Sequence, residues 1–340
     1  MNPHAVQADP ATTSMVGMAL LRNGTTLDKG QFSNQLSKAV EFILKEVESS
    51  SPNSLNITNV IGTQIQSKLG QNIDLVLASQ FLTNLLEKLP ENHPMRKRID
   101  KALNVCVVKI QDGQMADGST KGAGWAGVLQ SSLASNALEA AEYAGADVDV
   151  DKLENARKYQ TDNFNAESGS VNTDKGAGIV LYSVSGSARA AAKDARKTKE
   201  RVQEAKDQGL IEQAEEISAE MLRKIGFSED EAVKSETSYK VYESAKQTAQ
   251  RSDVMSGFGN NGGEEFLSFL QTGEGLVIGK DDSWRNWYDD VSGKMVKIQN
   301  QDGSWNGHHC ITSPVFCTAT CLLILSIEND LESLQTMGGS

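Results

Sequence analysis

Few features of this sequence would place the protein on a nucleic acid or in a membrane. Its 340 residues carry a formal net charge of −12, and Lys and Arg cluster only along one charged helical stretch. Nucleic acids and anionic membranes attract clustered cations, so neither is expected as a partner. No apolar run reaches the roughly 18 residues that suggest a membrane span. We therefore expect a soluble chain without a membrane span.

Proline and cysteine are also scarce. Six prolines leave long stretches free to be helical, because proline removes a backbone donor and breaks helices. The four cysteines are too few and too unevenly spaced for a disulfide framework: Cys106, Cys310, Cys317 and Cys321. Residues 6–8 resemble the cleavage site of a secretory signal, although the apolar segment of such a signal is missing. We expect a cytoplasmic protein as written, or an exported one if a signal was removed before this site.

One short phrase occurs twice. VKIQ begins at Val108 and again at Val296, which is 188 positions later. Each copy runs into a Gly/Asp turn, reaches Trp-x-Gly at Trp125 or Trp305, and then enters a helix rich in small residues. The separation equals about four periods of 47 residues, a length typical of two-helix repeats. Internal repetition therefore indicates one domain built of helical hairpins.

Two kinds of helix alternate along the chain. Some have apolar or small residues around most of their circumference, whereas residues 40–49 (VEFILKEVES) carry a single apolar stripe. We interpret these as the inner and outer helices of a closed ring. The sequence has no strand-like alternation of useful length, so we expect an all-α fold class. The inner helices are expected to begin near Ile73, Leu129, Ala177, Glu264 and Ser313.

The repeat pattern breaks in one segment and at both ends. Residues 192–250 are rich in Lys, Glu, Ala and Gln and lack the Gly/Trp turn, which predicts an elaborated outer hairpin with a solvated face. We expect residues 1–14 to form a flexible N-terminus and residues 336–340 a flexible tail. A single α/α toroid is then predicted for residues 15–335.

The segment from Gln299 to Trp305 resembles the QW motif of squalene and terpene cyclases, followed by the turn and inner helix of protein prenyltransferase β subunits. The phrases NGGEEFLSFL, SWRNW and DGSWNGHHC also resemble a group of bacterial proteins with prenyltransferase and squalene-oxidase repeats. The resemblance implies an α/α toroid in which the motif clasps neighbouring hairpins by hydrogen bonds, a tight turn and a packed indole. Its structural residues are Gln299, Asp302, Gly303, Trp305 and Trp125.

The acid motif of the cyclases is altered. Those enzymes protonate an alkene with the middle Asp of DxDD, whereas this chain has alternating aspartates at Asp147, Asp149 and Asp151. Because these residues precede a predicted helix, N-capping and solvation explain them better than catalysis. We expect them to be exposed and dispensable.

The zinc motif of the prenyltransferases is altered as well. Glu264 stands near the family's Asp ligand, Phe266 near its Cys and Cys317 in the place of its His. The chain still offers imidazoles, thiols and a carboxylate for a divalent metal, with zinc first. The metal candidates are His308, His309, Cys310, Cys317 and Glu264. The alternatives are a local disulfide between Cys310 and Cys317, inert buried thiols, or a thiol nucleophile activated by imidazole.

In a toroid the N-terminal ends of the inner helices converge on one mouth, where small residues leave room for a ligand. The cavity candidates are Glu264, Glu265, Trp284, Trp287, His308 and His309. Two functions stay open. One is a binding module for a hydrophobic, isoprenoid-like ligand or a protein partner. The other is an isoprenoid-handling or metal-assisted enzyme that uses this mouth.

Overall fold

The computed structural model describes residues 7–258 and 261–338. Helices account for 64% of the protein, which confirms the all-α fold class. The strands of the described part are two-residue segments, β1 (Phe164–Asn165) and β2 (Ser170–Val171), paired antiparallel in one loop. Within the same ranges no single helix is long and apolar enough to cross a membrane, and only the bent pair of residues 314–325 and 327–337 reaches that length and composition together.

An inner set of helices forms the centre of the molecule. In chain order these helices are α1 (Pro10–Arg22), α4 (Ile73–Lys88), α6 (Gly127–Tyr143), α8 (Val180–Asp207), α12 (Gly263–Ile278) and α14 (Pro314–Leu325). Each contacts the next, and α14 contacts α1, so the contacts close a cycle. The helices α4, α6, α8, α12 and α14 begin within three residues of the predicted positions, which confirms those starts.

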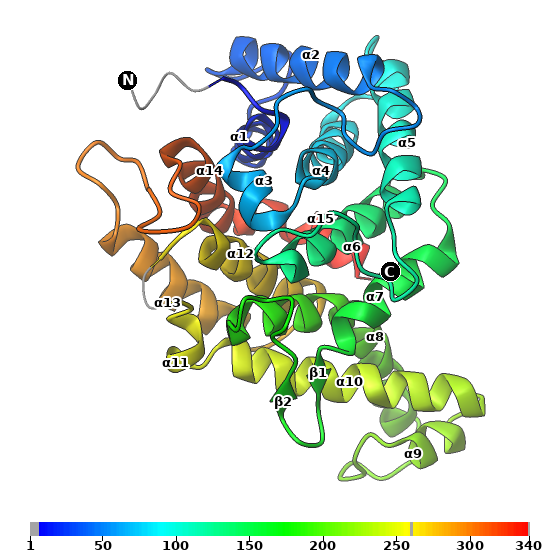
Figure 1. Cartoon of the computed structure of the whole chain (residues 1–340). Helices are drawn as coiled ribbons and strands as arrows, with labels where there is room; N and C mark the ends of the chain where they lie inside the picture. The colour runs from blue at the N-terminus through cyan, green and yellow to red at the C-terminus, as the bar shows by residue number, and fades with distance from the viewer. Residues whose placement is uncertain (1–6, 259–260, 339–340) are drawn as a thin grey trace.

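A second set of helices packs on the outside of the first. These are α2 (Ser33–Ser49) on α1, α5 (Arg96–Asp112) on α4, α7 (Val150–Thr161) on α6, α10 (Glu229–Ala249) on α8 and α13 (Trp284–Lys297) on α12. Figure 1 shows these five helices around the edge of the molecule. Burial separates the two sets as predicted, since 15 of the 17 residues of α6 are buried but only 5 of the 17 in α2. The remaining short helices are α3 (Gln64–Leu69), α9 (Ala219–Lys224), α11 (Ser252–Met255), η1 (Ile327–Asp330) and α15 (Leu331–Met337).

The second copy of the repeated phrase forms a clasp between α13 and α14. Trp305 is 3% exposed, and its indole Nε1 donates a hydrogen bond to the Met295 carbonyl oxygen at 2.8 Å. The amide of Gln299 donates to the carbonyl oxygen of Gly303, which adopts a left-handed φ of 85°. The predicted structural role of this copy is confirmed.

The first copy behaves differently. Trp125 is 37% exposed, so the prediction that it packs between hairpins is wrong. Its backbone N–H donates to the carbonyl oxygen of Ser67 at 3.2 Å, and its ring remains partly exposed. The same short phrase therefore ends in a core residue at one position and a surface residue at the other.

Both ends of the chain pack against the inner helices further than predicted. Asp9 caps α1 by accepting a hydrogen bond from the backbone N–H of Thr12, and Ala11 and Ser14 are fully buried. At the other end α15 continues to Met337, which is 7% exposed. The expectation of a flexible chain is therefore wrong for residues 10–14 and for 336–337. Residues 1–6, 339 and 340 lie outside the described part.

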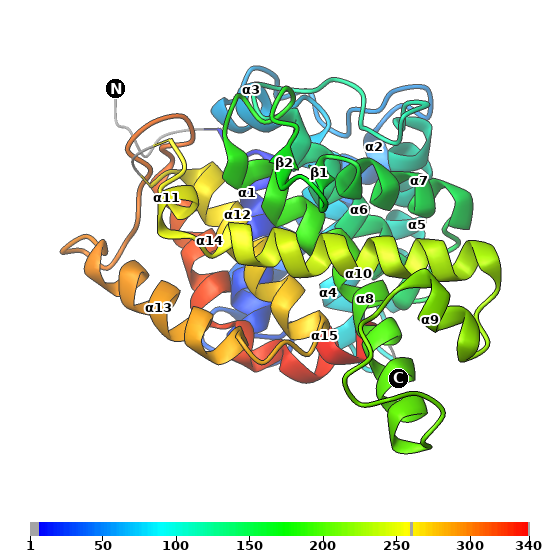
Figure 2. The same ribbon diagram turned by 90° about the horizontal axis from the view of Figure 1, so that it is seen from below.

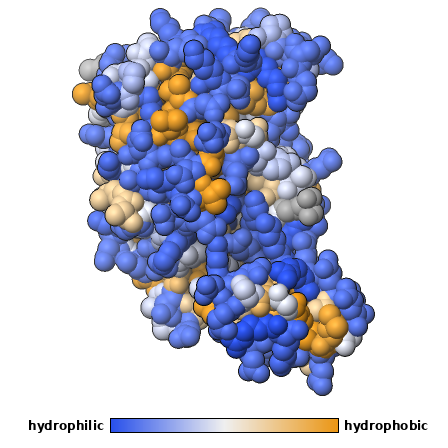
Figure 3. All heavy atoms as spheres, turned by 90° about the vertical axis from the view of Figure 1, so that its right-hand side faces the viewer, coloured by the Kyte–Doolittle hydropathy of each residue, from blue (hydrophilic) through white to orange (hydrophobic). Residues whose placement is uncertain are grey.

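The charged segment 192–250 consists of the end of α8, α9 and α10, with α10 packed along α8, and its far end projects as an arm. Helix α8 begins as an inner helix and continues beyond the core. Helices α9 and α10 then lead the chain back along α8 to the core. Figure 2 shows the end of α8 and α9 projecting from the body, and Figure 3 shows the mainly hydrophilic surface of this lobe. The arm has a small apolar core of its own, formed by Val202, Ala205, Ile211, Met221, Leu222, Phe227 and Ala232.

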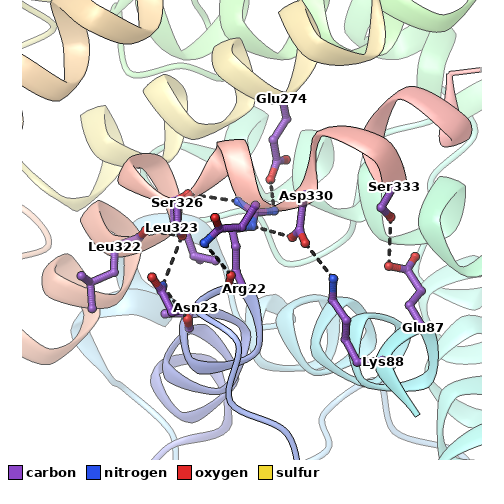
Figure 4. A network of polar contacts seen from close by, with 12 residues as sticks. Arg22, Asn23, Glu87, Lys88, Glu274, Leu322, Leu323, Ser326, Asp330 and Ser333 are labelled. Atoms are coloured by element: carbon purple, nitrogen blue, oxygen red, sulfur yellow. Dashed lines mark hydrogen bonds and ion pairs between the residues drawn. The ribbon is translucent and has the colours of Figure 1, made fainter. Parts of the chain in front are cut away.

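A buried ion-pair network ties α1 to the end of the chain (Figure 4). The Arg22 guanidinium contacts Glu274 of α12 at 2.7 Å and Asp330 of η1 at 2.8 Å. Lys88 of α4 contacts the other oxygen of Asp330 at 2.9 Å. The Arg22 side chain is 5% exposed, and loss of one partner of a buried pair is costly because the other charge is left in a low dielectric. This network therefore joins three helices of the contact cycle, α1, α4 and α12, to η1.

Candidate acidic site at the start of α12

Two adjacent carboxylates are buried in the first turn of α12. Glu264 and Glu265 are both 0% exposed. The N-terminal end of a helix favours negative charge, because its free N–H groups and macrodipole are positive. The segment that precedes α14 closes over this turn, since Gly263 donates to the carbonyl oxygen of Ile311 at 3.1 Å. These backbone contacts bring residues 307–311 against the two acids.

Glu265 is held from two directions. Its Oε1 accepts a hydrogen bond from the Tyr182 hydroxyl of α8 at 2.6 Å and from the Phe258 backbone N–H at 3.1 Å. The chain passes close above this side chain at Gly257, where φ is 55° and a Cβ would meet the Glu265 Cγ at 2.6 Å. Glycine is therefore required at that position. Burial and the neighbouring carboxylate raise the pKa of Tyr182, so its hydroxyl stays a donor.

Glu264 has one backbone partner. Its Oε2 accepts a hydrogen bond from the Ile311 N–H at 3.2 Å. Burial raises the pKa of this carboxyl to about 7, and the neighbouring Glu265 adds to the shift. Glu264 Oε1 and Glu265 Oε2 have no hydrogen-bond partner among the described residues. We call these two atoms the open carboxylate oxygens.

Four aromatic rings form a chain beside the acids. The Trp125 ring lies 6.4 Å from that of Tyr182 and 5.9 Å from that of Phe258, and Phe258 lies 4.7 Å from the His309 ring. Both ends of this row of aromatic rings lie at Glu265, because His309 Nε2 lies 4.0 Å from the Oε1 atom that Tyr182 contacts. Trp125 and Phe258 are exposed, so the aromatic chain reaches from the buried acids to the surface.

Lys68 of α3 is a basic residue of this protein that lies at the edge of the site. Its Nζ lies 5.0 Å from the Trp125 ring centroid, a cation–π distance. Its charge lowers the pKa of Glu264, although less than burial raises it. The acidic site is thus defined as Glu264, Glu265, Tyr182 and His309 with the rim residues Trp125, Phe258 and Lys68.

The predicted metal set is only partly assembled. Glu264, Glu265, His309 and Cys310 lie together, but His308 is exposed and Cys317 is buried with its thiol donating to the Ile311 carbonyl oxygen at 3.5 Å. Within residues 7–258 and 261–338, no three His, Cys, Asp or Glu side chains are arranged to hold a metal ion. The His308 and His309 rings lie 6.3 Å apart in an edge-to-face arrangement, and it is His309 that lies beside Glu265.

Of the disulfide, inert-thiol and nucleophile alternatives for the cysteines, the structure favours inert thiols. All four cysteines are free, so a Cys310–Cys317 disulfide is absent from the described chain. Burial raises the pKa of Cys317 to about 12, and burial with the charge of Glu264 raises that of Cys310. A protonated thiol is a poor nucleophile, which disfavours thiol catalysis. Cys310 has a left-handed φ of 57°, a strained conformation for a residue other than glycine.

The predicted placement of Trp284 and Trp287 at the mouth is wrong. Trp287 is 3% exposed and packs on Gly273, where a Cβ would meet its ring at 2.5 Å. Trp284 stacks on Trp287 with ring centroids 5.9 Å apart. Gly273 lies roughly 13 Å along α12 from Glu264 at 1.5 Å per residue. The two tryptophans therefore join α13 to the far half of α12.

Sequence reasoning missed four residues of the acidic site. Tyr182 lies in a helix that was expected for other reasons, Lys68 lies in the short helix α3, which was not predicted, and Phe258 precedes α12 in an irregular segment. Trp125 was singled out, but for a structural role. The one available signal was the position of Trp125 directly before an inner helix, which is where residues of the mouth were expected.

The aspartates near α7 take the role predicted for them. Asp147, Asp149 and Asp151 are all exposed. Asp149 caps α7 by accepting hydrogen bonds from the backbone N–H groups of Asp151 and Lys152. The prediction of N-capping and solvation is confirmed.

The space enclosed by the inner helices is small. A cavity of about 70 Å³ lies among α1, α4, α6, α8, α12 and the C-terminal helices. A water molecule takes about 30 Å³ of liquid volume, so this cavity holds about two waters. Its lining includes the polar side chains of Asn136, Arg189 and Gln271. This cavity therefore has no room for an isoprenoid chain.

No protein-family model matches the chain, and no curated protein or solved structure is found to be similar to it.

Proposed function

We propose that this chain is a protein-binding module built as an α/α toroid, and that its acidic site receives a positively charged side chain of the partner. The closed cycle of inner-helix contacts, the outer layer and the Trp305 clasp support the toroid. The 70 Å³ central cavity favours a protein partner over the hydrophobic ligand that the sequence also suggested. The partner then binds at the surface rather than inside the ring.

The observation that carries this proposal is the pair of open carboxylate oxygens. Glu264 and Glu265 are fully buried, and no Lys or Arg of the described residues forms an ion pair with either of them. A buried charge without a partner costs several kcal/mol, and a cation placed between two carboxylates removes that cost. The acidic site is therefore suited to a positive group that pairs with both carboxylates, a position that neither Lys68 at the rim nor His309 beside Glu265 takes in the described chain.

The rim selects the kind of cation. The rings of Trp125 and Phe258 are exposed beside the acids, and aromatic faces attract ammonium and guanidinium groups when these are within about 6 Å. Lys68 already occupies such a position over Trp125. The net charge of −12 further speeds the approach of a basic partner. These features fit a Lys or Arg side chain.

A second candidate is an enzyme in which Glu264 donates a proton. It is favoured by one observation, the pKa of about 7, because a general acid works best when its pKa is near the ambient pH. Tyr182 and His309 are in reach of the neighbouring Glu265 carboxylate. This candidate predicts turnover of a substrate, whereas the binding module predicts none.

The test uses butylguanidinium and butylammonium as probes, with 1-butanol as the neutral control. We expect both cations to shift the Trp125 indole signal in NMR spectra saturably at pH 8, and 1-butanol to leave it unchanged. Glu264→Gln/Glu265→Gln should abolish the shift, because it removes both negative charges with little change in shape. Glu91→Gln is the matched control, since the Glu91 side chain is 90% exposed. Absence of a shift at pH 8, or an equal shift in the double variant, would overturn the proposal.

A further inference from the structure

We propose that a groove next to the acidic site binds an extended, basic peptide segment of the partner protein. This inference rests on the proposed function, because the same partner would place one basic side chain in the acidic site. The groove has a volume of about 1050 Å³, above the range of about 300–1,000 Å³ typical of small-molecule pockets. Its size therefore leaves room for a short length of polypeptide.

The groove and the acidic site share two walls. Gln64 and Ile65 of α3 line the groove, while Lys68 of the same helix lies at the rim of the acidic site. The segment 307–315 forms the second wall. Its residues 312–315 line the groove, and its residues 309–311 contact the acids. Gln64 fastens the two walls by accepting a hydrogen bond from the Thr312 N–H at 2.8 Å. A chain that lies in the groove therefore passes beside the acidic site.

The lining of the groove suits an extended backbone. Ile61 is 78% exposed and Val315 is 49% exposed, and exposed apolar side chains in a concavity mark sites of interaction. Hydroxyl and amide groups also line the groove and can bind backbone N–H and C=O groups, as in other modes of peptide recognition. The polar lining includes Thr12, Thr13, Asn300, Ser304 and Asn306.

The charge of the groove selects a basic peptide. The acidic side chains of its lining are Asp9 and Asp302, and no Lys or Arg of the described chain lies among its lining residues. Both aspartates accept local hydrogen bonds, from Thr12 and Ser304 respectively. An acidic segment would meet repulsion here and again at the acidic site. Complementarity therefore requires apolar residues interspersed with Lys or Arg.

The probe for this inference is a random dodecapeptide library displayed on phage and selected against the immobilised full chain. We expect enrichment of peptides that combine Lys or Arg with apolar residues, and we expect Ile61→Arg to weaken the selected consensus peptide at least roughly tenfold in Kd. Val296→Arg is the matched control, because Val296 is 63% exposed on α13 and lies outside the groove. Failure to enrich basic peptides, or equal binding by Ile61→Arg and wild type, would overturn the inference.

Two further outcomes separate this inference from its alternatives. If wild type is a dimer and Ile61→Arg a monomer by light scattering, a second copy of the chain covers the groove and the peptide proposal is wrong. The butylguanidinium titration tests the acidic site without the groove. Retained cation binding with failed peptide selection overturns only the groove, and successful selection without cation binding overturns only the proposed function.

Discussion

Buried carboxylates occur in two contrasting settings in this molecule. Glu139 of α6 contacts two arginines, Arg189 at 2.6 Å and Arg157. Burial alone would raise the pKa of Glu139, but these guanidinium groups lower it to about 2. Glu264 lies equally deep without an arginine, and burial raises its pKa to about 7. Depth is therefore not what distinguishes the two settings. The two settings differ in whether an arginine is supplied. Glu139 pairs with two arginines, whereas no Lys or Arg of the described chain pairs with Glu264 or Glu265.

Substitution of Glu139, which pairs with two arginines, should have the largest effect on stability. Glu139→Gln leaves Arg189 buried and without its carboxylate partner, and a broken buried ion pair costs about 3–5 kcal/mol. We expect the free energy of unfolding in urea to fall by that amount. Glu264→Gln removes a charge that has no ion-pair partner in the described chain, and we expect no loss of stability from it. Equal destabilisation by the two variants would contradict the contrast.

The two tryptophans of the repeated phrase extend the comparison to packing. Trp305→Ala should lower the free energy of unfolding by about 3–5 kcal/mol, because it leaves a cavity in the core and removes the bond to Met295. Trp125→Ala should cost less than about 1 kcal/mol, since the ring is partly exposed. Thermal and urea unfolding measure both. A larger cost at Trp125 would show that its role is structural after all.

The two carboxylates should give opposite pH dependences of stability. The folded-state pKa of Glu264 is above its ordinary value of 4.5, so its contribution is present at low pH and is lost as pH rises from about 4.5 to 7. The folded-state pKa of Glu139 is below 4.5, so its contribution is present above that pH and is lost as pH falls toward 2. Urea unfolding of wild type, Glu264→Gln and Glu139→Gln across pH 3–8 separates them. A wild-type profile unchanged by Glu264→Gln between pH 4.5 and 7 would contradict the assignment.

The smallest effect is expected at the exposed aspartates. Asp149→Asn keeps a side chain that caps helices as well as Asp does, so unfolding should change by less than about 0.5 kcal/mol. Binding of butylguanidinium should be unchanged, because Asp149 lies outside the acidic site. A clear loss of either property would mean that these aspartates have a function beyond capping.

The sequence predicts the helical scaffold well because the repeated phrase and the two burial patterns carry it. The inner helices begin close to Ile73, Leu129, Glu264 and Ser313 as predicted, and Trp305 is buried. These features depend on local turn chemistry and on the periodicity of apolar residues, both of which are visible in one chain. The long extension of α8 into the arm was missed, since Lys and Glu continue a helix without showing where it leaves the core.

The site could be predicted only in part. Glu264, Glu265 and His309 come together as expected, because the starts of α12 and α14 are adjacent. Trp125 and Trp305 follow the same short phrase, yet only one is buried, because burial depends on which hairpin covers the ring. Tyr182 reaches Glu265 from α8, at a separation of 83 residues, and no local pattern encodes such a contact.

The central claim is that the Glu264–Glu265 pair awaits an external cation. Its most direct test is the titration of the Glu264 side-chain carboxyl by ¹³C NMR, in the absence and presence of saturating butylguanidinium. The account predicts a pKa of about 7 for the free protein, as burial requires. It predicts a fall of at least about one unit with the cation, because a nearby positive charge favours the ionised form. A pKa of Glu264 that does not change on addition of the cation would contradict the account.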